Sequence, residues 1–345
     1  MFESSRKKER YFGLDFLRGI CALIVVIYHI KSWRQSEGHG VLDGLLAWCG
    51  LYGVSIFFLL SGYSLAIAYE QKFLRGITSP VLYRYFKRRV GRIFPLFFFV
   101  LIISSLGRIT VSGNPVLLSE FFMNVFLLFG FFDSTATPVV GGWSIGVEMV
   151  FYLILPVLLI AKGLRSWLFV FFSFGLTVWV SEFVAQGNSL ESGWASYAAP
   201  ANHLVFFVIG VFLRTKLPSY MVSDRSVLFG VVLVVACVAY LSNGKSELEL
   251  VVGPLRLVMI VLASVVVYLF ASIKYLGLAA VSDFLGRISY PLYLIHPIVY
   301  FGGRNIYQYL GFSMFEVMVL CVLAATVLDY FFDQPVQRWL ARSGW

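Results

Sequence analysis

The sequence predicts an all-α protein that crosses a membrane many times, and three observations support this fold class. Only 13% of the 345 residues are charged, about half the fraction that is usual for a soluble domain. The mean hydropathy is +0.84. Apolar runs of about 20 residues, the length that a helix needs to cross the bilayer core, recur along the whole chain. A lipid bilayer is therefore the predicted surrounding of most of this protein.

Apolar segments are predicted throughout the chain, with no internal repeat, low-complexity tract or long linker between them. They cover residues 13–33, 47–69, 93–111, 116–132, 144–161, 166–183, 201–214, 226–241, 251–272, 286–303 and 314–332. We therefore expect one membrane domain over residues 1–345, with a cytoplasmic N-terminal segment at 1–12 and a cytoplasmic tail at 334–345.

The positions of basic residues predict the orientation and the number of crossings. Lys and Arg cluster at 6–10 and again at 72–92, which places both regions in the cytoplasm. If every segment crossed, the later basic loops would face outward. If the short segment 116–132 does not cross, the basic loops that follow it all face the cytoplasm. The prediction is about ten transmembrane helices plus one non-spanning or re-entrant apolar helix. Both termini are then cytoplasmic, in a multi-pass protein of the bacterial cytoplasmic (inner) membrane.

The sequence argues against several other classes of protein. The opening MFESSRKKERY is polar and basic and precedes a full-length apolar run, so no cleavable signal peptide is expected. The four cysteines form no CxxC pair and no Cys/His cluster, so neither a disulfide framework nor a metal site is expected. The net charge of +9 is attributed to cytoplasmic loops rather than to nucleic-acid binding.

The first predicted span carries ionisable residues at both of its ends. Arg18 and His29 lie on one face of a helix, about 16 Å apart along its axis, and Asp15 lies one turn before Arg18. Ionisable residues inside a span are costly and usually functional. Ala22 and Val25 share this stripe, which we predict to line a narrow channel. The alternative is an Arg that snorkels to the interface and an interfacial histidine.

Later spans contain further candidate residues. Arg89 and Arg92, three residues apart at the inner start of the third span, could clamp a phosphate, although a stop-transfer charge cluster is the alternative. Glu148 is predicted about one turn inside the outer face, where it needs a partner such as a histidine. His296 is predicted near mid-membrane. Ser61 lies in a small-residue pair that favours close helix packing.

Some local expectations concern helix regularity and exposure. Pro291 and Pro297 flank His296 and predict an irregular segment; the alternative to a functional role for His296 is that its imidazole fills a freed carbonyl site. His203, at an outer helix start, and His39, in an outer loop, are predicted to be surface histidines.

Five motifs in the order of the chain together resemble the membrane acyltransferases of acyltransferase family 3. They are Arg18 with His29, Gly53 to Tyr63, Arg89 to Pro95, Trp143 to Glu148, and Ser289 to Pro297. The resemblance covers essentially the whole chain. Two departures are notable: the family's common carboxylate pair is reduced to a single Glu148, and the chain resembles the stand-alone type without an appended esterase-like domain.

The resemblance implies an acyl-CoA donor, most often acetyl-CoA, and a hydroxyl of an extracytoplasmic glycan such as lipopolysaccharide O-antigen or exopolysaccharide as acceptor. We expect Arg18, Arg89 and Arg92 to bind the donor phosphates, with the pantetheine arm threading the channel toward His29.

Our hypothesis makes His29 the general base on the acceptor hydroxyl, because histidine titrates near neutrality, and makes Glu148 the group that orients it. A covalent acyl-histidine is left open. Asp15 would hold Arg18, and Ser61 and His296 would support the site.

Two rival functions use the same residues differently. A transporter or flippase could use the intramembrane Arg, His and Glu side chains as a substrate or proton path. The sequence lacks the paired broken helices that usually mark such a site. An acyltransferase could also act on a lipid or small molecule at the cytoplasmic side. The predicted outer position of His29 argues against this second reading.

Overall fold

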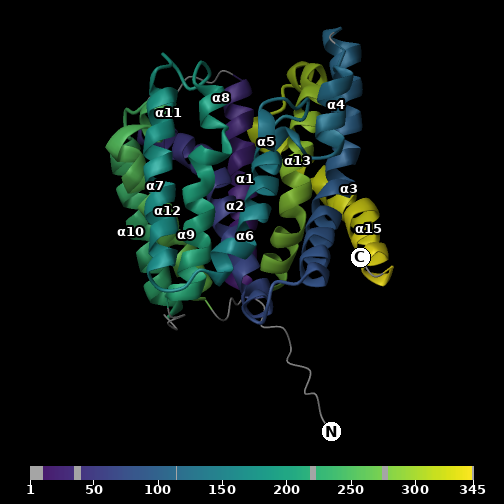
Figure 1. Cartoon of the computed structure of the whole chain (residues 1–345). Helices are drawn as coiled ribbons and strands as arrows, with labels where there is room; N and C mark the ends of the chain where they lie inside the picture. Colours follow the sequence, from purple (N-terminus) through teal and green to yellow (C-terminus); the bar gives the residue numbers. More distant parts are fainter. Residues whose placement is uncertain (1–10, 35–39, 114, 218–222, 274–278, 344–345) are drawn as a thin grey trace.

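The computed structural model describes residues 11–34, 40–113, 115–217, 223–273 and 279–343, and these residues form a bundle of helices (Figure 1). The elements are α1 (Phe12–Trp33), α2 (Val41–Leu74), α3 (Ser79–Ser112), α4 (Leu118–Val125), α5 (Phe129–Phe132), α6 (Trp143–Ile160), α7 (Leu164–Ala185), α8 (Trp194–Tyr197), α9 (Pro200–Lys216), α10 (Asp224–Ser242), α11 (Glu247–Val251), α12 (Gly253–Ala271), α13 (Ala279–Tyr309), α14 (Met314–Leu328), the π-helix η1 (Asp329–Asp333) and α15 (Gln334–Arg342).

The fold confirms the predicted polytopic helical membrane protein. Nine helices in the described part of the chain are long and apolar enough to cross a membrane. The more polar α13 is a further long helix of 31 residues. The segment predicted not to span is divided into α4, of 8 residues, and α5, of 4 residues. Neither reaches the length of about 17 residues that a crossing requires.

Several helices extend beyond their apolar segments. The basic cluster that precedes the third predicted span lies inside α3, which begins at Ser79 and carries Pro80 in its first turn. There the missing N–H of proline costs nothing. The prediction that Pro291 and Pro297 make their segment irregular is wrong, because α13 is helical through both. Packing of α13 along α1 and α14 supports it across these positions.

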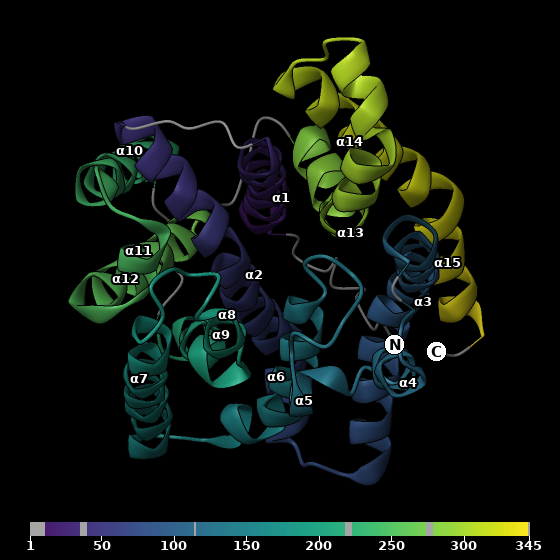
Figure 2. The ribbon, with the colours of Figure 1, turned by 90° about the horizontal axis from the view of Figure 1, so that it is seen from above.

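The central helices of the bundle are α1, α2 and α13. Seen from above, α2 runs obliquely through the centre, and α1 lies beside α13 (Figure 2). The α1 helix packs on α2 and α13, while α2 also packs on α6 and α9. Residues from the two ends of the chain therefore meet along α1.

Glycine allows the close approach of α2 and α9. A Cβ atom on Gly62 would lie 2.3 Å from the Phe207 carbonyl oxygen, and one on Gly210 would lie 2.2 Å from the Leu59 carbonyl oxygen. These distances are too short for any side chain, so the two backbones touch only because both residues are glycine. The structure confirms the predicted close packing at the Ser61–Gly62 pair.

His203 is buried rather than on the surface, which corrects the prediction for that residue. Only 1% of it is exposed, and its Nε2 lies 2.8 Å from the Tyr197 carbonyl oxygen. The start of α9 packs beneath α8, and the buried Arg256 side chain donates to the carbonyl of neighbouring Asn202. His39 lies outside the described residues.

Candidate active site

A cavity of about 390 Å³ opens among α1, α2, α3, α6 and α13. Its wall combines cationic, hydroxyl and aromatic side chains with a single carboxylate. The lining residues are Arg18, Val54, Phe57, Phe58, Ser61, Ser64, Leu65, Ala68, Arg89, Arg92, Ile93, Ser144, Ile145, Glu148, Tyr152, Gly286, Ser289, Tyr290 and Tyr293. We call it the arginine cavity, because three predicted donor-binding residues line it.

Arg18 reaches the arginine cavity from α1 and is held by two neighbours. Its Nη1 lies 3.2 Å from an Asp15 carboxylate oxygen, and its Nη2 donates to the Ser64 hydroxyl at 3.2 Å. The predicted Asp15–Arg18 pair is therefore present, as expected from residues three apart on a helix. The Ser64 bond additionally orients the guanidinium toward α2.

The predicted channel along the face of α1 is closed. Ala22 and Val25 are 0% exposed, and Val25 packs close to Gly53 of α2. The open volume instead follows α2, along Val54, Ser61 and Leu65. The prediction failed because helical spacing shows which residues share a face but not whether a neighbouring helix covers that face.

Arg89 is the cation of the arginine cavity with the fewest polar contacts among the described residues. Its guanidinium lies over the Tyr69 ring, 5.8 Å from the centroid. Its Nε is buried without a hydrogen-bond partner. A half-buried guanidinium with an unused donor can bind an anionic group, and phosphate matches its planar fork.

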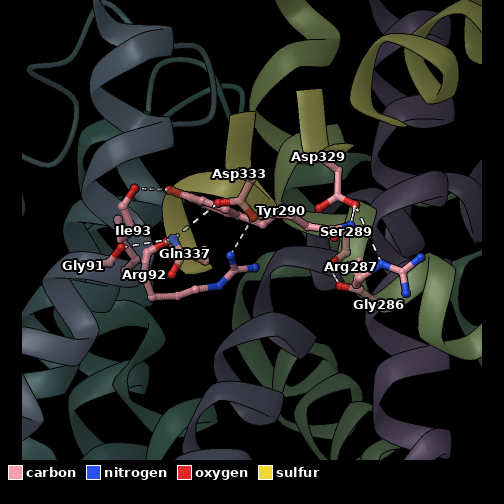
Figure 3. Close-up of polar contacts among 11 residues, drawn as sticks. Gly91, Arg92, Ile93, Gly286, Arg287, Ser289, Tyr290, Asp329, Asp333 and Gln337 are labelled. Carbon is pink, nitrogen blue, oxygen red and sulfur yellow. Dashed lines mark hydrogen bonds and ion pairs between the residues drawn. The ribbon is translucent and has the colours of Figure 1, made fainter. Parts of the chain in front are cut away.

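Arg92 also lines the arginine cavity, but it has a carboxylate partner (Figure 3). Its Nη1 lies 2.7 Å from an Asp333 oxygen, and its guanidinium lies over the Tyr290 ring at 5.5 Å. Gln337 donates to the Gly91 carbonyl at 3.1 Å, which joins α15 to the same turn of α3. Asp333 therefore fixes the position of Arg92 at the mouth of the cavity.

Asp329 and Asp333 were not predicted as site residues. Both lie in η1 and are nearly buried, with 4% and 3% exposure. Asp329 accepts a bond from Gln334 at 2.7 Å and lies 3.7 Å from Nε of Arg287. Carboxylates at the end of an apolar run are themselves a functional signal, and this signal was available in the sequence. The π-helix, a feature that recurs at functional sites, appears only in the structure.

Glu148 is bonded to Ser61 and not to a histidine, which differs from the predicted arrangement. The Ser61 hydroxyl donates to a Glu148 carboxylate oxygen at 2.6 Å, joining α2 to α6 in the wall of the arginine cavity. The carboxylate faces the same space as Arg89, so a negative and a positive side chain share one cavity.

His29 is paired with His296 of α13. Nδ1 of His29 lies 3.0 Å from Nε2 of His296, and Nδ1 of His296 lies 3.1 Å from the Leu292 carbonyl oxygen. The two rings are nearly parallel, with centroids 5.1 Å apart. His296 thus occupies the orienting position that was predicted for Glu148, and its ring also bonds a carbonyl of its own helix, although the Leu292 carbonyl is not one that either proline of α13 frees.

The carbonyl at Leu292 determines which nitrogens carry protons in the neutral pair. A carbonyl only accepts, so Nδ1 of His296 carries the proton and its Nε2 has a lone pair. That lone pair accepts from Nδ1–H of His29. The proton of neutral His29 is then on Nδ1, and Nε2 of His29 is an unprotonated base.

Ser144 and Tyr293 form a further polar group in the arginine cavity wall, near the histidine pair. Their hydroxyl oxygens are 2.9 Å apart, and each lies within 3.0 Å of the Gly141 carbonyl oxygen. The Tyr293 ring centroid is 6.2 Å from that of His296. Both residues belong to motifs noted in the sequence, but neither was predicted as a site residue.

Within the described ranges, no group of three or more His, Cys, Asp or Glu side chains could hold a metal ion. The site combines two imidazoles, hydroxyl groups and arginines. These groups can move a proton and bind an anion, which are the requirements of a group transfer from an anionic donor.

The fold and this site define a polytopic membrane protein with an intramembrane histidine pair, next to a cationic cavity. The family model described as an acyltransferase domain matches residues 11–331, so the chain belongs to acyltransferase family 3.

Curated relatives resemble the chain over part of its length. The peptidoglycan O-acetyltransferase OatA of Listeria monocytogenes is 25% identical over 175 residues, which are 46% of this chain and 26% of that protein. Protein 2 in the picA locus of Rhizobium radiobacter is 35% identical over 94 residues, 27% of this chain and 44% of that protein. The matches thus span less than half of either relative. No solved structure matches the chain.

Proposed function

We propose that this membrane acyltransferase moves an acetyl group from cytoplasmic acetyl-CoA to a hydroxyl of an extracytoplasmic glycan, with Nε2 of His29 as general base. The observation that carries the proposal is the chain of bonds from His29 through His296 to the Leu292 carbonyl. It leaves a lone pair on the one histidine nitrogen that a general base requires. The name of the Listeria relative supports a glycan acceptor.

The arginine cavity is the proposed donor site. Coenzyme A carries several phosphate charges at one end and a thioester at the end of a narrow arm. Arg18, Arg89 and Arg92 would bind the phosphates, since all three line the cavity. Arg18 and His29 are about 16 Å apart along α1, a length that an extended arm can cover. The arm would run along α2, and the thioester would approach the histidine pair past Tyr293.

The proposed reaction needs no metal ion or redox partner. Nε2 of His29 takes the proton of the acceptor hydroxyl as its oxygen attacks the thioester carbonyl carbon. The carbon–sulfur bond breaks, and the leaving thiolate takes the proton back from His29. The products are an O-acyl glycan and coenzyme A. The Ser144 and Tyr293 hydroxyls both bond the Gly141 carbonyl, and one of them would turn from it to donate to the thioester carbonyl oxygen as negative charge develops there.

Transfer of label from [14C]acetyl-CoA to envelope glycan in membrane vesicles tests the proposal. We expect transfer with the wild-type protein and a decrease of about 10²- to 10⁴-fold in His29→Ala, the range for losing a general base. Equal transfer in vesicles with His29→Ala, at equal protein content, would contradict the base assignment. Label recovered only in lipid extracts would contradict the glycan acceptor.

A further inference from the structure

A second hollow, of about 450 Å³, lies at the opposite end of α1 from Arg18. It is formed by the end of α1, the last turns of α13 and the turn before α14. The lining residues are Trp33, Arg34, Tyr300, Arg304, Tyr307, Gln308, Gly311 and Phe312. We call it the Trp33 pocket. It shares no lining residue with the arginine cavity, and nothing above assigns a role to it.

The Trp33 pocket adjoins the histidine pair through one aromatic side chain. The Trp33 ring stacks on His29 at 5.1 Å and 9°, and on His296 at 5.7 Å and 17°. The opposite side of the pair is close to Tyr293, which lines the arginine cavity. The two imidazoles therefore lie between two separate hollows, each reaching them through an aromatic neighbour.

The aromatic part of the Trp33 pocket suits a ring with apolar faces and polar edges. Trp33 and Tyr300 have centroids 4.9 Å apart, inclined at 40°. Tyr307 stacks on Phe312 at 5.8 Å and donates to the Val299 carbonyl, which holds its ring in place. A sugar ring presents C–H groups to such faces while its hydroxyls bond at the edges.

The polar part of the Trp33 pocket is cationic. Arg34 and Arg304 contribute two guanidinium groups, Gln308 contributes an amide, and no lining residue is acidic. Nη2 of Arg34 donates to the Phe312 carbonyl at 2.9 Å, which fixes this arginine and leaves other donors available. Arg304 has no carboxylate partner among the described residues and is exposed. Such a pair favours a sugar that carries a carboxylate or a phosphate.

We infer that the Trp33 pocket is the acceptor site, which binds a sugar unit bearing an anionic group and presents its hydroxyl to His29. This inference rests on the proposed function, because it assumes that His29 activates a glycan hydroxyl. It adds where the acceptor binds, the chemical class of the acceptor and the residues that bind it. Donor and acceptor would then approach the histidine pair from opposite ends of α1.

Acceptor-directed variants test the inference in the same vesicle assay. Arg304→Ala should raise the acceptor concentration for half-maximal transfer about tenfold, the loss expected for one hydrogen bond to a charged group. Arg304→Lys should recover part of the lost affinity for the acceptor. The affinity for acetyl-CoA, measured by equilibrium binding to the purified protein, should not change. Asn305→Ala is the matched control, because this neighbour is exposed on the same helix and does not line the pocket.

A binding measurement with defined sugars tests the charge of the acceptor. Glucose 1-phosphate and methyl α-glucoside carry the same free hydroxyls, and N-acetylmuramic acid is N-acetylglucosamine with a lactyl ether, which bears a carboxylate, on the oxygen at C3. We expect the anionic member of at least one pair to bind about tenfold more tightly to wild type, and this preference to disappear in Arg304→Ala. The favoured pair distinguishes phosphate from carboxylate.

Two results would overturn the inference while leaving the proposed function intact. One is normal transfer in Arg304→Ala with no preference for an anionic sugar, while His29→Ala is inactive. The other is a decrease in acetyl-CoA affinity that matches the decrease in transfer, which would make the Trp33 pocket part of the donor site. If wild type and His29→Ala transferred label equally, the base assignment within the proposed function would be wrong, and absence of transfer by the wild type would contradict the proposed function itself.

Discussion

Replacing His296 with alanine tests the orientation of the proposed base directly. The substitution removes the acceptor for Nδ1–H of His29, which is 3.0 Å away, and leaves His29 itself in place. The His29 ring can then rotate or take the other neutral tautomer, in which Nε2 carries the proton. The acceptor hydroxyl would then meet an N–H group in place of a lone pair.

The expected loss follows from the cost of that missing partner. A buried donor without an acceptor costs about 1–3 kcal/mol, and about 1.4 kcal/mol corresponds to tenfold in rate. We therefore expect kcat for acetyl transfer in His296→Ala to decrease about 10- to 100-fold, less than in His29→Ala. KM for acetyl-CoA should stay within about twofold, since His296 does not line the arginine cavity.

The assay is label transfer from [14C]acetyl-CoA in vesicles with matched protein content. His203→Ala is the control, because His203 is nearly as buried and also bonds a backbone carbonyl, but does not line the arginine cavity or contact the histidine pair. It should lower thermal stability without changing kcat of the folded protein. Wild-type kcat in His296→Ala would refute the tautomer reasoning. An equal loss of kcat in His203→Ala would show that removing any buried histidine lowers kcat, whatever its position.

Three further substitutions probe the donor site and the packing. Arg89→Ala should raise KM for acetyl-CoA about tenfold through loss of a charged hydrogen bond. Arg88→Ala should leave KM unchanged, because Arg88 does not line the arginine cavity. A lower kcat at unchanged KM in Arg89→Ala would contradict the donor-binding role. Asp333→Asn should raise the KM for acetyl-CoA about three- to tenfold, because Arg92 loses the charge of its partner, and Asp333→Glu should recover part of the donor affinity; unchanged donor KM would argue against positioning by Asp333. Gly62→Val should lower the free energy of unfolding by at least about 1–3 kcal/mol, seen as earlier thermal aggregation in detergent, and an unchanged melting profile would disprove the close contact with α9.

Local features of this fold were predictable from the sequence, because spacing and charge encode them. The Asp15–Arg18 bond follows from two residues one helical turn apart. The non-spanning segment 116–132 followed from the positions of basic residues in the loops along the chain, and the structure divides it into α4 and α5. In both cases the prediction needed only residue positions along the chain and no contact between distant segments.

The pairings that build the site were not predictable in the same way. His29 and His296 are 267 residues apart, and Arg92 and Asp333 are 241 apart. Sequence reasoning identified both histidines but assigned Glu148 as the partner of the first. Several polar groups compete for each partner inside a membrane, and only the packing of α1 on α13 decides between them. The wrong prediction of a channel along α1 has the same cause, because α2 packs over the face of α1 that contains Val25.

The separation of the arginine cavity from the Trp33 pocket has a consequence for how such proteins diverge. In the described residues the two walls share no side chain, and they draw on different stretches of the sequence except along α1 and α13. A substitution in the turn between α13 and α14 alters one hollow and leaves the other intact. Under the proposed roles, a lineage could acquire a new acceptor by changing a few residues near Gly311, while the machinery for its donor is inherited unchanged.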